Sequence, residues 1–257
     1  MGINRKEGSV SMDREDYRNL GYQILAERLS KDDVRLLQKI LVDWKAEDTF
    51  LSSYGIIQNN IYKDLSIFRE MMKKYRLGAL ACELLDIPEI VLFQDNLIWK
   101  PPQTPKPVQW HQDYSYWPLS APSGVIFWIA LDDVYKENGA LSYIPQSERW
   151  GECRAMNFIT DGEMDGQEDL PSLPWKEHAH EQVIMEIEAG QILAHHPLLA
   201  HMSYPNLSQF SRRAWSLMYI TPDVCWDTKH AAHPYPVFHS VKNGATLEGD
   251  DFPRFQR

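Results

Sequence analysis

The stretch GQILAHHPLLAHMSYPNLSQFSRRAWSLMYI, residues 190–220, decides the fold prediction. It reads as two strands joined by a turn around YPNLSQ, residues 204–209. The stretch carries histidines at positions 195, 196 and 201, and it carries the pair Arg212–Arg213 near its end. Adjacent residues of a strand face opposite sides of a sheet. At most one of His195 and His196, and one of the two arginines, can therefore face an interior pocket.

A second stretch, WHQDYSYW at residues 110–117, places His111 and Asp113 two residues apart. The Pro-rich loop PPQTPKP at 101–107 precedes it and indicates an extended chain. In an extended segment the two side chains share one face. An imidazole and a carboxylate at this spacing can take two adjacent positions on one metal ion. Alone the pair is a weak signal, because a chain with nine histidines readily contains one by chance.

A histidine from the distal stretch can complete a triad of two imidazoles and one carboxylate. With three positions left open, such a triad is typical of non-haem Fe(II) oxygenases. An arginine beyond the metal can bind the carboxylate of a co-substrate with two hydrogen bonds, which lysine does less well. The residue types leave the choice open between His201 and its neighbours, and between Arg212 and Arg213.

The rest of the chain indicates a mostly β fold with flanking helices. Helical periodicity dominates residues 13–86, with Ser30 as a predicted N-cap, and strand patterns fill the β-core at 89–222. Residues 146–180 read as a long insertion inside that core. The first twelve residues are polar and expected to be frayed, and residues 223–257 form a C-terminal tail. We predict a single domain over 1–257, with a sandwich or barrel core.

Composition excludes several function classes. The formal net charge of −10 disfavours nucleic acids and anionic membranes as partners, since both attract clustered Lys and Arg. No apolar run approaches the roughly 20 residues that span a bilayer. The three cysteines are widely spaced and odd in number. They predict neither a zinc site nor a disulfide framework, and they favour a reduced, cytoplasmic protein.

The chain resembles the phytanoyl-CoA dioxygenase family of Fe(II)/2-oxoglutarate-dependent oxygenases. Two blocks carry the resemblance. The first is LIWKPP, WHQDYSYWPL and SGVIFWIALDDVYKENGALSYIPQSE within residues 97–148, and the second is AGQILAHHPLLAHMSYPNLSQFSRRAWSLMYI at 189–220. PQSE stands where the family has PGSH, and AGQ where it has AGD. The resemblance implies a double-stranded β-helix (jelly-roll, cupin-like) core, with Fe(II), 2-oxoglutarate and O₂ as cofactor and co-substrates.

The resemblance also implies roles for individual residues. His111, Asp113 and His201 would ligate Fe(II), since only His201 among the distal histidines has Ser two and Arg eleven residues later. Arg212 and Ser203 would bind the far carboxylate of 2-oxoglutarate. Further members of the site are implied less directly: Asn96 and Trp128 around 2-oxoglutarate, and Tyr114, Tyr116, Trp117 and Trp99 against a flat or apolar substrate.

The implied reaction is hydroxylation of an unactivated C–H bond, with decarboxylation of 2-oxoglutarate to succinate. Asp113 favours this outcome, because related halogenases carry a small residue there. Desaturation, cyclisation and epoxidation are possible on the same site. Two rival functions remain, a cupin-like oxygenase that needs no 2-oxoglutarate and a non-enzymatic metal-binding protein. Because no basic cluster suits a CoA phosphate, we expect a small substrate of specialised, natural-product metabolism.

Overall fold

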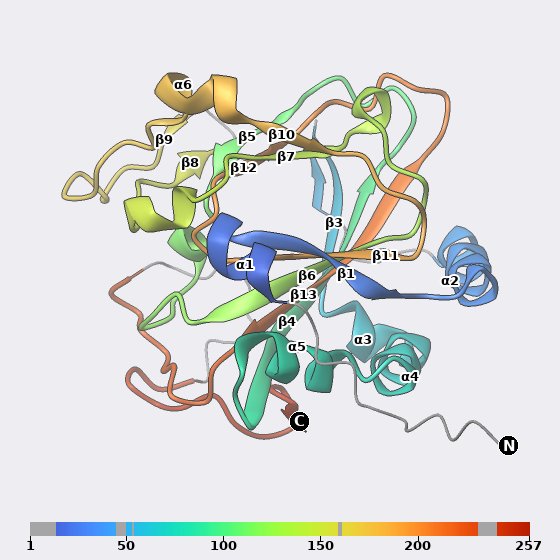
Figure 1. Cartoon of the computed structure of the whole chain (residues 1–257), viewed down its shortest axis with the longest axis horizontal. Helices are drawn as coiled ribbons and strands as arrows, with labels where there is room; N and C mark the ends of the chain where they lie inside the picture. The colour runs from blue at the N-terminus through green and yellow to red at the C-terminus, as the bar shows by residue number, and fades with distance from the viewer. Residues whose placement is uncertain (1–13, 45–49, 53, 159–160, 231–240) are drawn as a thin grey trace, which may run out of the picture.

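The computed structural model describes residues 14–44, 50–52, 54–158, 161–230 and 241–257. Its strands form two main antiparallel sheets that face each other (Figure 1). The larger sheet contains β1 (Tyr22–Arg28), β2 (Phe50–Ser52), β3 (Gly55–Asn59), β4 (Glu89–Lys100), β6 (Gly124–Ala130), β11 (Gln191–His195), β13 (Arg212–Ile220) and β14 (Arg254–Gln256). Their order is β1-β11-β6-β13-β4-β3-β2, and β14 pairs with β4.

The smaller sheet contains β5 (Val108–His111), β7 (Leu141–Tyr143), β10 (Val183–Met185) and β12 (His201–Ser203), in the order β10-β7-β12-β5. Trp128 and Leu193 of the larger sheet pack in one buried cluster with Leu141 and Tyr143 of the smaller sheet. Two antiparallel sheets that enclose a common interior form a double-stranded β-helix, or jelly roll. The predicted fold class is confirmed.

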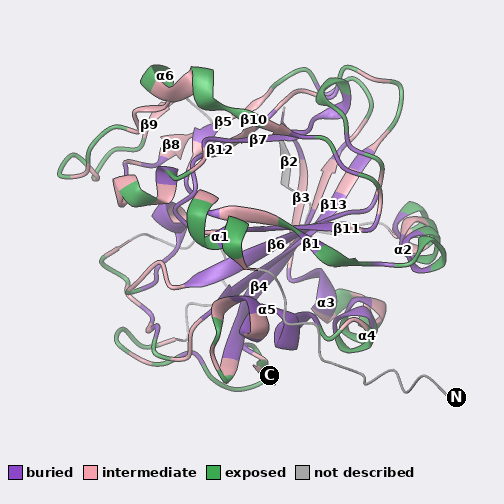
Figure 2. Ribbon diagram, in the orientation of Figure 1, coloured by how far each residue is buried: buried purple, intermediate pink, exposed green. Residues whose placement is uncertain are grey.

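Helices cover the outer face of the larger sheet. They are α1 (Glu15–Leu20), α2 (Lys31–Asp43), α3 (Ile61–Asp64), α4 (Ser66–Lys74) and α5 (Leu77–Leu85). Ser30 is the N-cap of α2 as predicted, and its hydroxyl accepts a hydrogen bond from the Asp33 amide at 3.2 Å. Phe68 of α4 packs edge-on against Trp215 of β13, with ring centroids 4.9 Å apart. In Figure 2 the central strands β4 and β6 are mostly buried, whereas α1 and α2 have largely exposed surfaces.

The prediction that residues 190–220 form two strands joined at YPNLSQ is wrong. The stretch forms three strands, which are divided between the two sheets. β12 pairs with β5 and β7 in the smaller sheet, whereas β13 pairs with β4 and β6 in the larger one. The loop between β12 and β13 therefore crosses from one sheet to the other and is no hairpin turn. Local alternation cannot reveal this, because it does not say which strand is the partner.

The long insertion at 146–180 holds only short elements. They are η3 (Ser147–Trp150), the β8–β9 hairpin (Met156–Asn157 and Gly162–Glu163) and α6 (Trp175–His178), which is followed by η4 (Ala179–Glu181). Within the C-terminal tail, β14 extends the larger sheet. The prediction for residues 1–12 lies outside the described residues. Among the described helices none is long and apolar enough to cross a membrane.

Candidate metal centre

His111 and His201 lie opposite each other on neighbouring strands of the smaller sheet. The register of β5 and β12 pairs the two residues directly, and their ring centroids are 4.1 Å apart. In each ring Nδ1 lies within hydrogen-bond distance of a backbone carbonyl, Gln109 O at 2.7 Å and Leu199 O at 2.9 Å. A carbonyl can only accept, so Nδ1 carries the proton and Nε2 keeps its lone pair. Both imidazoles therefore present a metal-binding nitrogen to the interior.

Asp113 completes the group, although the local structure differs from the prediction. Strand β5 ends at His111, and Asp113 has helical backbone angles (φ −68°, ψ −38°) at the start of η1 (Tyr114–Tyr116). Gln112 fixes this bend, because its side-chain amide donates to the carbonyl of Leu198 at 2.8 Å. Asp113 Oδ1 lies 3.5 Å from Nε2 of His111 and 3.7 Å from Nε2 of His201. The three ligand atoms lie within 4.8 Å of one another.

The charge states of His201 and Asp113 are those that a metal requires. Burial lowers the pKa of His201 to about 3, so its imidazole is neutral at physiological pH. Burial alone would raise the pKa of Asp113, but its contacts with the neighbouring imidazole rings hold it well below its usual value. Neutral imidazole and ionised carboxylate are the ligating forms. Two such nitrogens and one oxygen, gathered within 4.8 Å of one another, fit Fe(II).

Two buried basic side chains lie side by side on the inner face of the larger sheet. Arg212 and Lys100 are each 1% exposed, on the paired ends of β13 and β4. Nε and Nη1 of Arg212 have no hydrogen-bond partner among the described residues, and its guanidinium lies over the Trp128 ring, 5.4 Å from the centroid. Burial, and then the adjacent Arg212 charge, lower the pKa of Lys100 to about 6. Lys100 donates hydrogen bonds to the carbonyls of Ser203 and Tyr204. An unpaired buried guanidinium such as that of Arg212 is costly, so its surroundings are suited to an anionic ligand.

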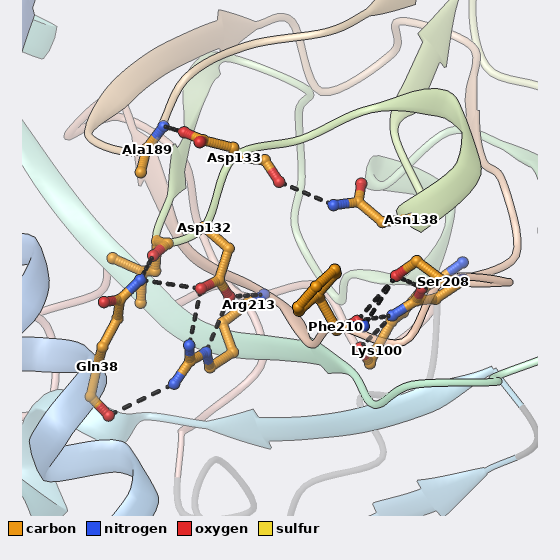
Figure 3. Close-up of polar contacts among 11 residues, drawn as sticks. Gln38, Lys100, Asp132, Asp133, Asn138, Ala189, Ser208, Phe210 and Arg213 are labelled. Atoms are coloured by element: carbon orange, nitrogen blue, oxygen red, sulfur yellow. Dashed lines mark hydrogen bonds and ion pairs between the residues drawn. The ribbon is translucent and has the colours of Figure 1, made fainter.

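Arg213 points the opposite way and is fully engaged. Its guanidinium forms a bidentate ion pair with Asp132 at 2.8 and 2.7 Å, and it also donates to the Gln38 carbonyl at 3.4 Å (Figure 3). Trp99 lies beside it, with the Arg213 guanidinium 5.7 Å from the ring centroid. The sequence left the choice between the two arginines open, and in the structure only Arg212 faces the interior. Trp99 belongs to the outer side with Arg213.

Two polar residues expected near 2-oxoglutarate are also buried on the inner faces. Ser203 is 4% exposed and lies on β12 two residues after His201. Asn96 is 8% exposed on β4, and its side-chain oxygen has no hydrogen-bond partner in the described part of the chain. Lys100, which the sequence analysis did not assign, lies on the same face as Asn96. The two positions are four apart on one strand, and side chains at an even offset point to the same side. The Lys-Pro pair was visible in the sequence, but the direction of the Lys100 side chain was not.

The sequence pattern of the family described as Phytanoyl-CoA dioxygenase (PhyH) matches residues 18–214. The chain belongs to the phytanoyl-CoA dioxygenase family. Phytanoyl-CoA dioxygenase 1 of Oryza sativa subsp. japonica is 35% identical over 158 residues, which are 60% of this chain and 54% of the rice protein. L-proline trans-4-hydroxylase of Streptomyces griseoviridis is 30% identical over 155 residues, 51% of this chain and 54% of that protein. The chain spans about half the length of the curated relatives it matches.

The fold of this phytanoyl-CoA dioxygenase family member is similar to that of a solved structure. The epimerase SnoN, in complex with Fe3+, alpha ketoglutarate and nogalamycin RO, superposes with a TM-score of 0.75 at 21% sequence identity. The similarity covers 94% of this chain and 96% of SnoN. At this identity the likeness concerns the jelly-roll fold.

The aromatic residues of WHQDYSYW divide between the site and the core of this family member. The Tyr116 ring lies 6.0 Å from the His111 ring and stacks on Phe158 at 5.6 Å. Phe158, in the long insertion, is itself 5.2 Å from His111 and was not anticipated from the sequence. Tyr114 and Trp117 instead belong to a buried apolar cluster of the core. The structure therefore places Tyr116 and Phe158 beside the triad, and Tyr114, Trp117 and Trp99 away from it.

The two remaining histidines of the distal stretch face opposite sides, as predicted. His195 is 1% exposed on the inner face of β11. His196 is half-buried, and its Nδ1 accepts a hydrogen bond from the Leu198 amide at 3.0 Å. Neither belongs to the compact group of His111, Asp113 and His201. The geometry thus favours His201 as the distal ligand, while His195 remains beside it with a side chain directed inward.

One contact between the C-terminal tail and the segment after Asp113 should depend on pH. His230 Nδ1 lies 2.5 Å from the Trp117 carbonyl, and its Nε2 lies 2.6 Å from a Glu152 carboxylate oxygen. Burial opposes protonation, but the Glu152 carboxylate and the carbonyl outweigh it and raise the pKa of His230. A raised folded-state pKa stabilises the fold fully below the unfolded value of about 6.5, and this contribution is lost as the pH rises through the folded value.

We therefore expect the melting temperature of the wild type to fall across this window more steeply than that of His230→Leu. Thermal unfolding from pH 5 to 9 measures the difference. Parallel curves would show that the protonated imidazole does not hold the tail.

Proposed function

We propose that the chain is an Fe(II)- and 2-oxoglutarate-dependent dioxygenase that hydroxylates an unactivated C–H bond of a small molecule and forms succinate. One observation carries the proposal. The triad shares one interior with an arginine that is 1% exposed and whose Nε and Nη1 have no hydrogen-bond partner among the residues that the structure describes. The triad accounts for iron, and the free cation accounts for the far carboxylate of a diacid.

In this proposal the residues of the site have separate roles. His111, Asp113 and His201 hold Fe(II) by two neutral nitrogens and one anionic oxygen. Arg212, with Lys100 beside it and Ser203 opposite, binds and orients the distal carboxylate of 2-oxoglutarate. Bound iron and 2-oxoglutarate supply the activation of O₂ and the oxidising power.

The wall of the pocket excludes water from the co-substrate. Trp128 covers one face of the Arg212 guanidinium, which keeps the distal carboxylate in a dry, low-dielectric environment. Asn96 lies on the same inner face, and its side-chain oxygen has no hydrogen-bond partner within the described ranges.

Asp113 supports hydroxylation as the outcome. A carboxylate ligand occupies the position that a halide needs, so halogenation is disfavoured. Named relatives and structural neighbours include a proline hydroxylase and an epimerase. The fold therefore hosts more than one outcome, and hydroxylation is the proposal that the intact triad favours.

The substrate we propose is a small molecule of natural-product metabolism with a flat or apolar part. Tyr116 and Phe158 stack beside His111 and offer such a group an aromatic surface. A net charge of −10 does not attract the phosphates of CoA. Efficient turnover of acyl-CoA substrates would contradict this part of the proposal.

The two rival functions are disfavoured by the same pocket. A cupin-like oxygenase without 2-oxoglutarate does not need a buried, unpaired arginine. A non-enzymatic metal-binding protein would use the triad, but it does not need the buried, unpaired arginine in the same interior.

The test is an anaerobic titration of the metal-free protein with Fe(II) and then 2-oxoglutarate, observed through the visible metal-to-ligand charge-transfer band. We expect the band in the wild type and in His180→Ala, whose side chain is 76% exposed, and no band in His111→Ala. Iron binding without a band would favour the oxygenase that needs no 2-oxoglutarate. No iron binding at all would contradict the metal centre.

A further inference from the structure

A third imidazole approaches the metal centre from the larger sheet. Nε2 of His195 lies 3.6 Å from Oδ2 of Asp113, whereas Nε2 of His111 and of His201 approach the other oxygen, Oδ1, at 3.5 and 3.7 Å. The two oxygens of the Asp113 carboxylate therefore have different neighbours. One oxygen faces the two ligand imidazoles, and the other faces His195.

The partner of Nδ1 distinguishes His195 from the two ligand histidines. In His111 and His201, Nδ1 meets a carbonyl, which can only accept a hydrogen bond. In His195, Nδ1 lies 3.0 Å from the Tyr143 hydroxyl, which can donate. If Nδ1 carried the proton instead, that buried hydroxyl hydrogen would have no acceptor among the described residues, and an Nε2 lone pair would face a carboxylate.

The tautomer that satisfies both groups has Tyr143 donating to Nδ1 and a proton on Nε2. This Nε2 is buried and has no hydrogen-bond partner in the described part of the chain, and the carboxylate oxygen that faces it is Oδ2 of Asp113, 3.6 Å away. Tyr143 is itself fixed, because it is fully buried and pairs with His201 in the smaller sheet. Tyr143, His195 and Asp113 thus form a chain that links both sheets to the metal centre.

We propose that His195 is a positioning residue for the metal centre, which holds Oδ2 of Asp113 through Nε2–H so that Asp113 offers iron Oδ1 alone. The inference rests on the proposed function. A monodentate carboxylate leaves three positions open, which 2-oxoglutarate and O₂ require. Hydrogen bonds to metal-ligating carboxylates orient the ligand and tune its basicity. His195 is thus assigned a role beside the ligands and is excluded from the ligand set.

The test uses three variants of His195 and Co(II) as an air-stable probe of the full chain. His195→Leu removes both nitrogens. His195→Gln places an amide N–H near the position of Nε2 and can still reach Asp113, whereas His195→Asn places it near Nδ1 and can only meet Tyr143. Co(II) affinity is measured by competition with a chelator. The intensity of the visible Co(II) band reports coordination number, and electron spin echo of the Cu(II)-loaded protein counts bound imidazoles.

We expect Co(II) to bind about 10- to 100-fold more weakly to His195→Leu and His195→Asn than to the wild type. Affinity and band intensity should return to near wild-type values in His195→Gln. If His195 only stabilised the fold, His195→Gln and His195→Asn would not differ in Co(II) affinity and band intensity in this way. Two coordinated imidazoles are expected in every variant.

Each other outcome overturns the inference. Three imidazoles in the wild type and two in His195→Leu would make His195 a fourth ligand. Equal affinity and equal spectra in the wild type and all three variants would remove the positioning role but leave the metal centre intact. A wild type that binds no Co(II) would contradict the proposed function as well, so the two failures are distinguishable.

Discussion

The Asp113→Ala variant should lose Fe(II) binding and, with it, hydroxylation. Asp113 is the only carboxylate in the ligand group, and its removal leaves two neutral imidazoles without an anionic partner for the metal. Because the loss of a residue that merely supports a ligand costs about 10- to 100-fold in metal affinity, the loss of the ligand itself should exceed about 100-fold. Anaerobic Fe(II) titration, followed by succinate formation from 2-oxoglutarate, measures both effects.

Two further variants separate charge from volume and from folding. Asp113→Asn keeps the shape of the side chain but removes its charge, and it should resemble Asp113→Ala in Fe(II) affinity. Asp132→Asn removes a carboxylate that pairs with Arg213 on the outer side, so it should bind Fe(II) normally and melt at a lower temperature. Normal turnover by Asp113→Ala would show that the metal assignment is wrong.

The Arg212→Ala variant should need far more 2-oxoglutarate than the wild type. A fully buried guanidinium that pairs with a carboxylate contributes about 2–5 kcal/mol to binding when truncation is the measure. The dissociation constant of 2-oxoglutarate should therefore rise by at least about 30-fold. Titration of 2-oxoglutarate into the Fe(II)-loaded protein measures this constant directly.

Arg213→Ala is the matched control, one residue away and on the opposite face. It leaves Asp132 without its bidentate partner, so it should lower the melting temperature while 2-oxoglutarate binds normally. Arg212→Ala has the reverse pattern, because Nε and Nη1 of Arg212 have no partner within the described structure to lose. If Arg213→Ala weakened 2-oxoglutarate binding and Arg212→Ala did not, the strand would face the other way.

The grouping of the triad residues and the direction of Arg212 could be predicted from the sequence because spacing along the chain carries that information, whereas their roles as ligands stay predictions. His111, Asp113, His201 and Arg212 lie in two short stretches whose order resembles a known family, and the structure gathers the first three within 4.8 Å. The argument from strand alternation was nevertheless wrong for Asp113. The chain bends after His111, and a hydrogen bond from Gln112 to Leu198, far away in sequence, fixes that bend.

Three site residues could not be predicted because their roles depend on long-range pairing. Lys100 lies beside Arg212 only because β4 pairs with β13. Phe158 comes from an insertion without a regular pattern, and His195 could be assigned only after the partner of each ring nitrogen was known. The same limit explains the error over residues 190–220, where alternation predicted strands but not the sheet to which each belongs.

The crossing from β12 to β13 has a consequence for the lifetime of the protein. His201 and Arg212 follow each other closely along the chain but project from opposite sheets, so iron and 2-oxoglutarate, bound as proposed, bridge the two. Ligands that bind only the folded state stabilise it in proportion to the logarithm of their concentration. Partly opened chains are the ones that proteases remove. The abundance of this protein in a cell should therefore rise and fall with the supply of 2-oxoglutarate.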